Sequence, residues 1–525
     1  MAGDEERLKA DVLIIGCGIS GSAAALAASK AGLDVLVISK SSDMQESNTR
    51  YAQGGIVSLG PDDDPDLLRR DIFESGDGIN NPEAVDVLVS DSKPMVDEIL
   101  IEELGIDFSR NGEDELDFAR EGGHSRRRIL HVQDTTGKTI EEAFLAALAR
   151  RPNVRILADH TAVDLLTVPH HAKNPQAYYR EPACVGAYVL DNRSRRVRMI
   201  LAGRTVLATG GCGAVFLNTS NPKTAVGSGY AMALRAGARI AHMEYIQFHP
   251  TVLYHRDCDG FLISETVRGE GARLKSLDGR TFMDKYGGLK DLAPRDEVSR
   301  AIYEEMILTN ADHVLLDLAS YAKVDVKIRF PHIFETCLRY GIDISREPIP
   351  VVPAAHYCCG GVLVDTWGKT SLHGLYAVGE ASCTGLHGAN RLASTSLLEG
   401  LVWGTRAGRF LAGDRTPPTG FSESDVRRWY YPPQPEEVDP ALINQDWLTI
   451  RSTMWNYAGL VRTTKRLERA KADLEYLEHR IDKFYREAIL DPDIIRLRHG
   501  LQVALMIVRA AIANPVSSGA HYRLD

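Results

Sequence analysis

The chain has 525 residues, more than one hydrophobic core usually organises, so two to four structural units are expected. A hydrophobic fraction of 44% and a charged fraction of 25% are ordinary for a globular protein. The formal net charge of −10 argues against a nucleic-acid-binding protein, which would need a basic domain. Any anionic ligand must therefore be held by a local basic cluster.

The start of the chain, MAGDEERLKADVLIIG, is acidic where a signal peptide is basic, and no apolar run approaches the roughly 18 residues of a membrane span. The 8 cysteines form no C-x-x-C pair and have no recurrent metal-ligand spacing. We therefore expect a soluble, cytoplasmic protein without membrane association, metal site, iron–sulfur cluster or disulfide.

The first elements in chain order predict a β-α-β unit. Residues 11–15 are a β-branched run, residues 20–31 are rich in alanine and end before Gly32, and residues 35–38 are a second apolar run. Two later runs, 205–209 and 375–378, are also typical of strands in a parallel sheet. About 165 residues separate them, too many for one connection in a compact domain, which predicts an inserted domain at about 250–355.

The C-terminal part of the sequence has a different character. Residues 413–440 are rich in proline and polar residues, as in a linker. Residues 441–515 follow helical periodicity, with opposite charges four residues apart such as Lys471 and Glu475. We therefore expect a helical bundle at this end.

Gly16, Gly18 and Gly21 form a G-x-G-x-x-G motif between the first strand and the first helix. The first glycine permits a tight turn, the second lets the backbone approach a pyrophosphate, and the third lets helix and strand pack closely. The helix N-terminus then offers free N–H groups to the phosphates. Ser39 and Lys40 stand where an NAD site expects an acidic residue, so the motif indicates a dinucleotide without the usual NAD signal.

Two further segments carry a family resemblance. Residues 47–57 (SNTRYAQGGIV) and 379–400 (GEASCTGLHGANRLASTSLLEG) resemble the flavoprotein subunits of fumarate reductase and succinate dehydrogenase, and the L-aspartate oxidases. The resemblance runs from residue 10 to about 410 and continues more weakly into the helical tail. It implies an α/β fold: a Rossmann-like FAD-binding domain at 1–249 and 356–425, an inserted α+β capping and substrate domain at 250–355, and a C-terminal helical bundle at 426–525.

The resemblance implies FAD as the cofactor. It assigns FAD contacts to loops and element ends: Gly16, Cys17, Gly18, Ile19, Ser20, Gly21, Lys40, Asn48, Thr49, Arg50, Tyr51, Ala52, Gln53, Gly54, Gly55, Ala162, Val163, Glu380, Ser396 and Leu397. Membrane-complex relatives have a histidine bonded to the flavin where Asn48 stands, so noncovalent FAD is expected here. Ser228 stands where the family usually has an aspartate, which predicts somewhat weaker FAD binding.

The same resemblance implies a dicarboxylate site, in which fixed cations and donors offset the desolvation of the substrate. Arg391 is expected to bind one carboxylate, and His249, Ser264 and His356 to donate to carboxylate oxygens. Arg295 is expected to bind carboxylate and to act in proton transfer only in the direction of fumarate reduction. Each has a structural alternative: a histidine before proline is often a core or loop residue, and an arginine before aspartate is often part of a surface ion pair.

Residues 119–131 (AREGGHSRRRILH) resemble the L-aspartate oxidases, and Glu121 offers an ionic partner to a substrate ammonium group. The implied reaction oxidises L-aspartate to iminoaspartate, with oxygen or fumarate as the electron acceptor. The product would feed quinolinate synthase in NAD biosynthesis. The alternatives are a soluble flavoprotein of fumarate reductase or succinate dehydrogenase type, and a binding module of the same fold without turnover.

Three smaller features remain open at this point. Arg126, Arg127 and Arg128 predict either a solvated face or a basic patch that attracts dianionic substrate. Cys358 and Cys359 are expected to be packing residues beside the site. Ser518 stands where a family motif in the tail has arginine, which leaves the packing of the tail undetermined.

Overall fold

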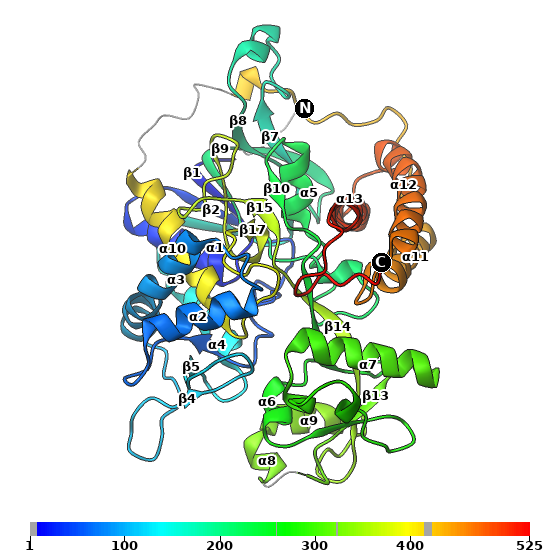
Figure 1. Cartoon of the computed structure of the whole chain (residues 1–525). Coiled ribbons are helices and arrows are strands. Elements are labelled where there is room, and N and C mark those ends of the chain that lie inside the picture. Colours follow the sequence, from blue (N-terminus) through cyan, green and yellow to red (C-terminus); the bar gives the residue numbers. More distant parts are fainter. Residues whose placement is uncertain (1–7, 259, 322–323, 414–422) are drawn as a thin grey trace.

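The computed structural model describes residues 8–258, 260–321, 324–413 and 423–525 (Figure 1). Within these ranges the largest sheet has seven strands in the order β6-β2-β1-β9-β8-β7, with β16 beside β9. Its strands are β1 (Leu8–Ile15), β2 (Val35–Ile38), β6 (Val154–Leu157), β7 (His160–Val168), β8 (Ala183–Asp191), β9 (Arg196–Leu207) and β16 (Leu375–Ala377). β6, β2, β1, β9 and β16 are parallel, whereas β7 and β8 extend the sheet with antiparallel pairs.

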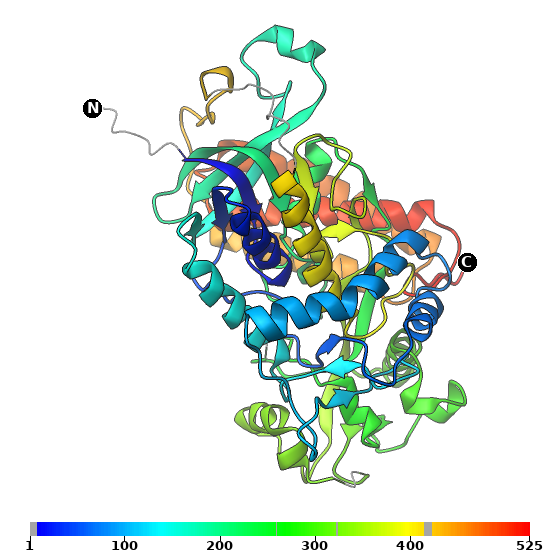
Figure 2. The same cartoon turned by 90° about the vertical axis from the view of Figure 1, so that its left-hand side faces the viewer.

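The parallel part of the sheet is apolar because helices cover it. All four residues of β2 are buried, as expected of a strand with both faces covered. Helix α1 (Ile19–Lys30) packs along α10 (Thr395–Gly413), and Figure 2 shows the two side by side. Gly404 lets them approach closely, since a Cβ there would collide with the carbonyl of Ser20.

The predicted β-α-β unit is present with small shifts at its ends. The strand expected at 205–209 overlaps the end of a longer strand, β9, which stops at Leu207 and whose N-terminal half pairs with β8. β16 ends one residue earlier than expected. These boundaries depend on neighbouring strands, which local sequence does not reveal.

Residues 250–355, which we call the inserted unit after the prediction from sequence, contain most of a second sheet with the order β11-β14-β13-β12. The elements are β11 (Ile246–Leu253), α6 (Glu265–Gly269), β12 (Arg273–Lys275), α7 (Arg295–Thr309), β13 (Val314–Asp317), α8 (Val326–Arg329), α9 (Pro331–Arg339) and β14 (Ile349–Cys358). This unit lies at the bottom of Figure 1 and has its own core around Ile302 and Leu316. β11 and β14 pair antiparallel and connect it to the rest of the molecule.

The C-terminal helices are α11 (Pro440–Ala458), α12 (Thr464–Glu487) and α13 (Pro492–Ala513). They share one hydrophobic core with β7, β8 and α5 (Ser228–Arg235), so this end docks on the main sheet. Lys471 and Glu475 on α12 lie 4.0 Å apart, as their spacing predicts. Part of the expected linker, residues 414–422, lies outside the described residues.

Smaller elements complete the described chain. Two three-stranded sheets are β3 (Ile56–Val57), β5 (Ile129–Leu130) and β4 (Phe118–Ala119), and β10 (Ile240–Ala241), β15 (Gly361–Leu363) and β17 (Ser382–Cys383). The other helices are α2 (Pro65–Ser75), α3 (Pro82–Met95), the π-helix η1 (Val96–Glu103), α4 (Thr136–Ala149) and the short 3-10 turns η2 (Pro175–Tyr179), η3 (Gly213–Val215), η4 (Met283–Lys285), η5 (Lys290–Leu292), η6 (Gly379–Ala381) and η7 (Glu423–Asp425).

In the described part of the chain, no helix has both the length and the apolarity needed to cross a membrane. The cysteines are free thiols, and Cys358 and Cys359 are buried.

Candidate active site

One cavity of about 870 Å³ runs from the carboxyl ends of β1 and β2 to the inserted unit. Its volume is in the range of cofactor and substrate pockets. The edge at which parallel strands end is where α/β sheets bind ligands, because loops and helix N-termini converge there. The cavity is therefore the candidate active site.

The glycine turn at one end of the cavity has the conformation that a dinucleotide requires. Gly16 has φ +110°, and a Cβ there would collide with the carbonyl of Ala208. Gly21 packs against the Gly16 carbonyl, which places α1 directly behind the turn. Among the described residues, no side chain caps α1 and no acidic residue lies in its first turn. Its N-terminus is therefore suited to phosphate.

Lys40 extends the same end of the cavity from the loop after β2. Its ammonium group donates to the carbonyl of Thr224, and burial lowers the pKa of Lys40 to about 8. Ser228, the residue that departs from the family pattern, also lines the cavity at the first position of α5. Both residues therefore line the same cavity as the glycine turn.

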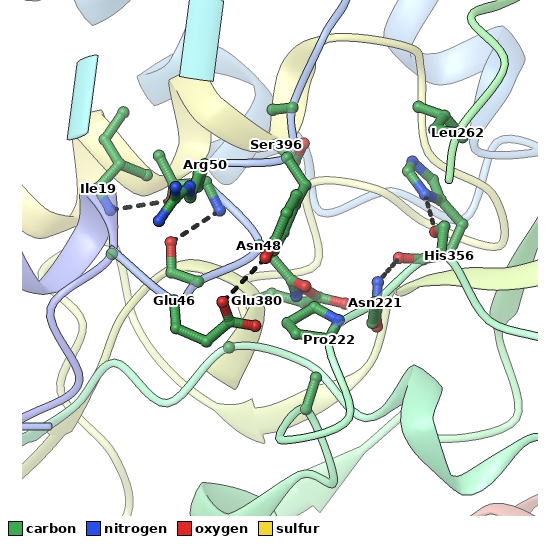
Figure 3. Close-up of a pocket in the computed structure, with 18 of the residues that line it drawn as sticks. Ile19, Glu46, Asn48, Arg50, Asn221, Pro222, Leu262, His356, Glu380 and Ser396 are labelled. Atoms are coloured by element: carbon green, nitrogen blue, oxygen red, sulfur yellow. Dashed lines mark hydrogen bonds between the residues drawn. The ribbon is translucent and has the colours of Figure 1, made fainter. Parts of the chain in front are cut away.

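Glu380 connects the loop that carries Asn48 with strand β14. Its Oε2 accepts a hydrogen bond from Asn48 Nδ2 at 3.1 Å (Figure 3), and its Oε1 accepts from the backbone N–H of Cys358 at 3.0 Å. Burial raises the pKa of Glu380 to about 7. Gly211 permits this arrangement, since a Cβ there would collide with the carboxylate. We call this part of the cavity the cradle. Its lining is polar, and its glycines leave the space that a flavin dinucleotide needs.

Most of the predicted cofactor residues line this cavity. They are Gly16, Cys17, Gly18, Ile19, Ser20, Lys40, Asn48, Thr49, Arg50, Tyr51, Ala52, Gln53, Gly54, Gly55, Ala162, Glu380, Ser396 and Leu397. Gly21 and Val163 do not line it. Gly21 acts through packing instead, and the side chain of Val163 belongs to the core of the main sheet.

All six predicted substrate residues line the same cavity, although they come from different parts of the chain. They are Glu121, His249, Ser264, Arg295, His356 and Arg391. His249 and His356 lie on the adjacent strands β11 and β14, with ring centroids 5.4 Å apart. Ser264 caps α6, and Arg295 begins α7.

Three of these side chains present buried polar atoms that have no hydrogen-bond partner: His249 Nε2, Arg295 Nη1 and Arg391 Nε. Burial and Arg295 lower the pKa of His249 well below its usual value, so its ring is neutral. Its Nδ1 accepts from the backbone N–H of Thr251 at 3.2 Å, so Nε2 carries the proton. Three buried donors without partners are a strong indication of an anionic ligand.

Arg391 is held firmly in place. Its Nη2 donates to Gln247 Oε1 at 3.0 Å, and its guanidinium lies 4.7 Å from the ring centre of Tyr357. The Tyr357 hydroxyl in turn donates to Glu399 at 2.7 Å. Burial lowers the pKa of Arg391, but an arginine stays charged at neutral pH. The fork is therefore fixed before substrate arrives.

A chain of charges leads from Arg295 into the inserted unit. Arg295 Nε donates to Glu265 Oε2 at 2.6 Å, and Arg268 Nη2 lies 3.5 Å from Glu265 Oε1. Burial opposes ionisation of Glu265, but the two arginines outweigh it, so its pKa is lowered. The segment from Ser264 to Gly271 was expected near the site, but neither Glu265 nor Arg268 was given an individual role. Their spacing of three residues, which places them on one helix face, was the available signal.

Glu121 lies at the other side of the same cavity and is only 8% exposed. Ser394 Oγ donates to its Oε2 at 2.7 Å, and the backbone of Gly54 lies against its other oxygen. Burial raises the pKa of Glu121, and the charge of Arg295 opposes that rise. A carboxylate thus stands beside an anion-binding set of cations.

The prediction made for the arginine run at 126–128 is wrong for Arg128. Arg128 is fully buried, with ion pairs to Asp63 at 2.7 Å and Asp71 at 2.5 Å. Neither the solvated face nor the substrate-attracting patch applies to it, because two carboxylates from the region of α2 enclose the guanidinium. Asp71 also accepts from the backbone and hydroxyl of Ser125 at 2.8 Å, so this network fixes the loop that carries Glu121.

Comparisons with known proteins agree with this geometry. The family model of the FAD binding domain matches residues 11–397, and that of the fumarate reductase flavoprotein C-terminus matches residues 448–525. The L-aspartate oxidase of Halobacterium salinarum is 44% identical, with 98% of this chain and 96% of the relative covered. L-aspartate oxidase 1 of Ralstonia nicotianae is 42% identical, with 98% and 95% covered. A solved quinol fumarate reductase from E. coli has TM-score 0.87 and 28% identity, covering 99% of this chain and 92% of that one.

The chain therefore belongs to the fumarate reductase family of FAD-binding flavoproteins, and FAD is its cofactor. The two family models together match most of the chain. Relatives that are 42–44% identical to the chain over nearly its full length include several L-aspartate oxidases.

Proposed function

We propose that the chain is an FAD-dependent L-aspartate oxidase that converts L-aspartate to iminoaspartate. The observation that carries the proposal is the position of Glu121, in one cavity with the unpartnered donors of His249, Arg295 and Arg391. Such a set matches a molecule with two carboxylates and one ammonium group. The names of the chain's relatives support the same activity.

Each side chain has a role in this proposal. Arg391 binds one carboxylate with its fixed fork, while His249, His356 and Ser264 donate to carboxylate oxygens. Residues 250–355 cap the substrate, and the residues at the β1 and β2 ends hold FAD noncovalently, because Asn48 offers no ring nitrogen for a covalent bond.

Bound FAD supplies a two-electron acceptor for the hydride from the substrate Cα. The side chains orient that carbon and manage the protons. L-Aspartate must lose one proton from its ammonium group together with the hydride to give the iminium product. Glu121 faces that group, and a carboxylate whose pKa is raised by burial is suited to accept the proton.

In a second half-reaction, which would restore the oxidised cofactor, fumarate takes up a hydride at one alkene carbon and needs a proton at the other. Arg295 holds that proton, and Glu265 with Arg268 replaces it from the inserted unit. Oxygen is the alternative acceptor. Iminoaspartate is then consumed by quinolinate synthase, which places the enzyme at the first step of NAD biosynthesis.

The decisive experiment is anaerobic addition of L-aspartate to the purified yellow protein while the flavin absorbance is recorded. We expect bleaching by L-aspartate and little or none by succinate at the same concentration. Bleaching by succinate but not by L-aspartate would indicate a fumarate reductase or succinate dehydrogenase type of flavoprotein instead. Absence of bleaching with both would indicate a binding module.

A further inference from the structure

The chain following α13 contacts residues that flank the active site. Residues 518–522, which we call the clasp, form a tight turn in which Ser518 and His521 exchange two backbone hydrogen bonds of 2.9 Å. In Figure 1 this red segment passes between α13 and α7. It contributes no residue to the cavity lining. Its contacts nevertheless reach the neighbours of two substrate arginines.

On one side the clasp contacts the loop that precedes α10. The backbone N–H of Ala520 donates to the carbonyl of Ala389 at 2.9 Å. Gly519 has φ +49°, and a Cβ there would meet Ala389 at 2.7 Å. Ser518 Oγ donates to Asp77 at 2.6 Å, beside the same loop. The clasp therefore packs directly against the residues that lead to Arg391.

On the other side the clasp contacts α7 of the inserted unit. The guanidinium of Arg300 lies 4.9 Å from the ring centre of Tyr522 and donates to the carbonyl of Gly519 at 3.4 Å. Arg300 also pairs with Asp296 at 2.9 Å. Asp296 directly follows Arg295, so this contact reaches the second substrate arginine.

A direct link closes the arrangement. Asn390 Nδ2 lies 3.4 Å from Asp296 Oδ1, and Asn390 Oδ1 accepts from Gln247 at 2.6 Å. Gln247 is also the residue that holds the Arg391 fork. The clasp thus lies over the junction between the residues flanking Arg295 and those flanking Arg391.

The clasp is itself fixed to the helical domain. Arg462 is fully buried and donates to His521 Nδ1 at 2.6 Å and to the carbonyl of Glu244 at 2.7 Å. His521 Nε2 donates in turn to the carbonyl of Asn514 at 2.9 Å. A rigid anchor of this kind can transmit a fixed position to whatever the turn touches.

We propose that the clasp is a positioning element, which sets the spacing between Arg295 of the inserted unit and Arg391 of the main domain and so determines how tightly a dicarboxylate is held. This inference rests on the proposed function for the identity of the substrate, but its ligand chemistry is shared by every C4 dicarboxylate. Weakening the clasp loosens the pair of cations without removing either of them.

The test uses the FAD-loaded full chain and succinate, which carries both carboxylates and no ammonium group. Tyr522→Ala and Arg300→Met should each raise the Kd of succinate, measured from the flavin difference spectrum, about fivefold to twentyfold. Because Arg300→Met already removes the contact with the ring of Tyr522, the double variant should be little worse than Arg300→Met alone. KM for L-aspartate should rise by a similar factor, with kcat changed much less.

Two controls make the result decisive. Tyr522→Phe keeps the ring face under Arg300 and should retain wild-type succinate affinity. Tyr476→Ala, which removes an exposed tyrosine of α12, should change neither Kd nor FAD content. Unchanged succinate affinity in Tyr522→Ala and Arg300→Met, whatever their Tm, would overturn the proposal, as would effects that simply multiply in the double variant. If Tyr522→Ala does not fold, Tyr522→Leu, which keeps an apolar side chain but removes the ring under Arg300, takes its place.

The succinate measurement is independent of the catalytic activity. If L-aspartate fails to reduce the flavin of the unaltered protein, the proposed function fails, whereas succinate binding still decides the role of the clasp.

Discussion

The hydroxyl of Ser394 donates to Oε2 of Glu121 across 2.7 Å, although 273 residues separate them in the chain. Ser394 adopts φ +57°, a left-handed conformation that costs a residue with a Cβ roughly 1–2 kcal/mol. The protein thus holds a strained residue at the point where the carboxylate faces the cavity. This contact is the basis of the first two predictions.

Glu121→Gln keeps the shape of the side chain and removes its charge. Loss of a charge-assisted contact to the substrate ammonium should lower kcat/KM for L-aspartate about 10- to 150-fold. Fumarate reduction should be unchanged or faster, because fumarate has no ammonium group and is relieved of repulsion. Steady-state assays with both substrates measure the change in selectivity. An equal loss with both would assign Glu121 to loop structure.

Ser394→Ala removes the donor that favours the ionised form of Glu121. Burial already raises the pKa of Glu121, and loss of the donor raises it further. L-Aspartate binding needs the carboxylate ionised, so kcat/KM rises with pH through this pKa, and the rising limb should move to higher pH. At neutral pH the loss should be about tenfold.

The control is Ser394→Gly, which also removes the hydroxyl but accommodates the positive φ. The same displacement of the pH profile in both variants identifies the hydroxyl as the cause. A normal profile in Ser394→Ala would remove this residue from the account of selectivity.

Glu265→Gln interrupts the chain from Arg268 to Arg295. Fumarate reduction should fall at least about 100-fold, since it depends on renewal of the proton at Arg295, while L-aspartate oxidation should fall less. Glu270→Gln is the matched control, because Glu270 forms a more exposed pair with Arg329 at 3.1 Å just after α6. Equal losses in Glu265→Gln for both directions would argue for a purely structural ion pair.

Gly211→Ala introduces a methyl group against the Glu380 carboxylate. FAD affinity should fall at least about tenfold, because the contacts of Glu380 to Asn48 and to β14 must both shift. Fluorescence of FAD released on dilution measures the change. Gly112→Ala, where the added methyl meets open space, is the control.

Noncovalent binding of FAD gives a separate prediction. Heat or acid should release all FAD from the unaltered protein, and flavin retained on a denaturing gel would contradict noncovalent binding.

The glycine turn and the first β-α-β unit could be predicted from the sequence, because both depend on residues that are close together in the chain. The convergence of Arg295, His356 and Arg391 was accessible only through family resemblance, since no local pattern brings these positions together. Arg128 shows the limit: its neighbours Arg126 and Arg127 are exposed, whereas Arg128 is buried by two carboxylates more than 50 positions earlier in the chain.

Other features were missed for a similar reason. Ser394 is one polar residue in a run of small ones, and its role depends on a contact with a loop from the first quarter of the chain. The clasp lies beyond the part of the sequence that carries the strongest motifs. Its importance depends on where the helical domain docks, which composition and periodicity do not determine.

The two strands that carry the inserted unit, β11 and β14, also carry His249 and His356. A substrate held by these histidines therefore contacts the two strands that connect the inserted unit to the rest of the molecule. A substitution deep in the core around Ile302, far from any ligand, would then be felt first as altered substrate affinity, because the strands transmit it to the histidines. The glycine turn, built on β1 and β2, would be affected less, whereas Glu380 accepts a hydrogen bond from Cys358 of β14 and would be affected in part.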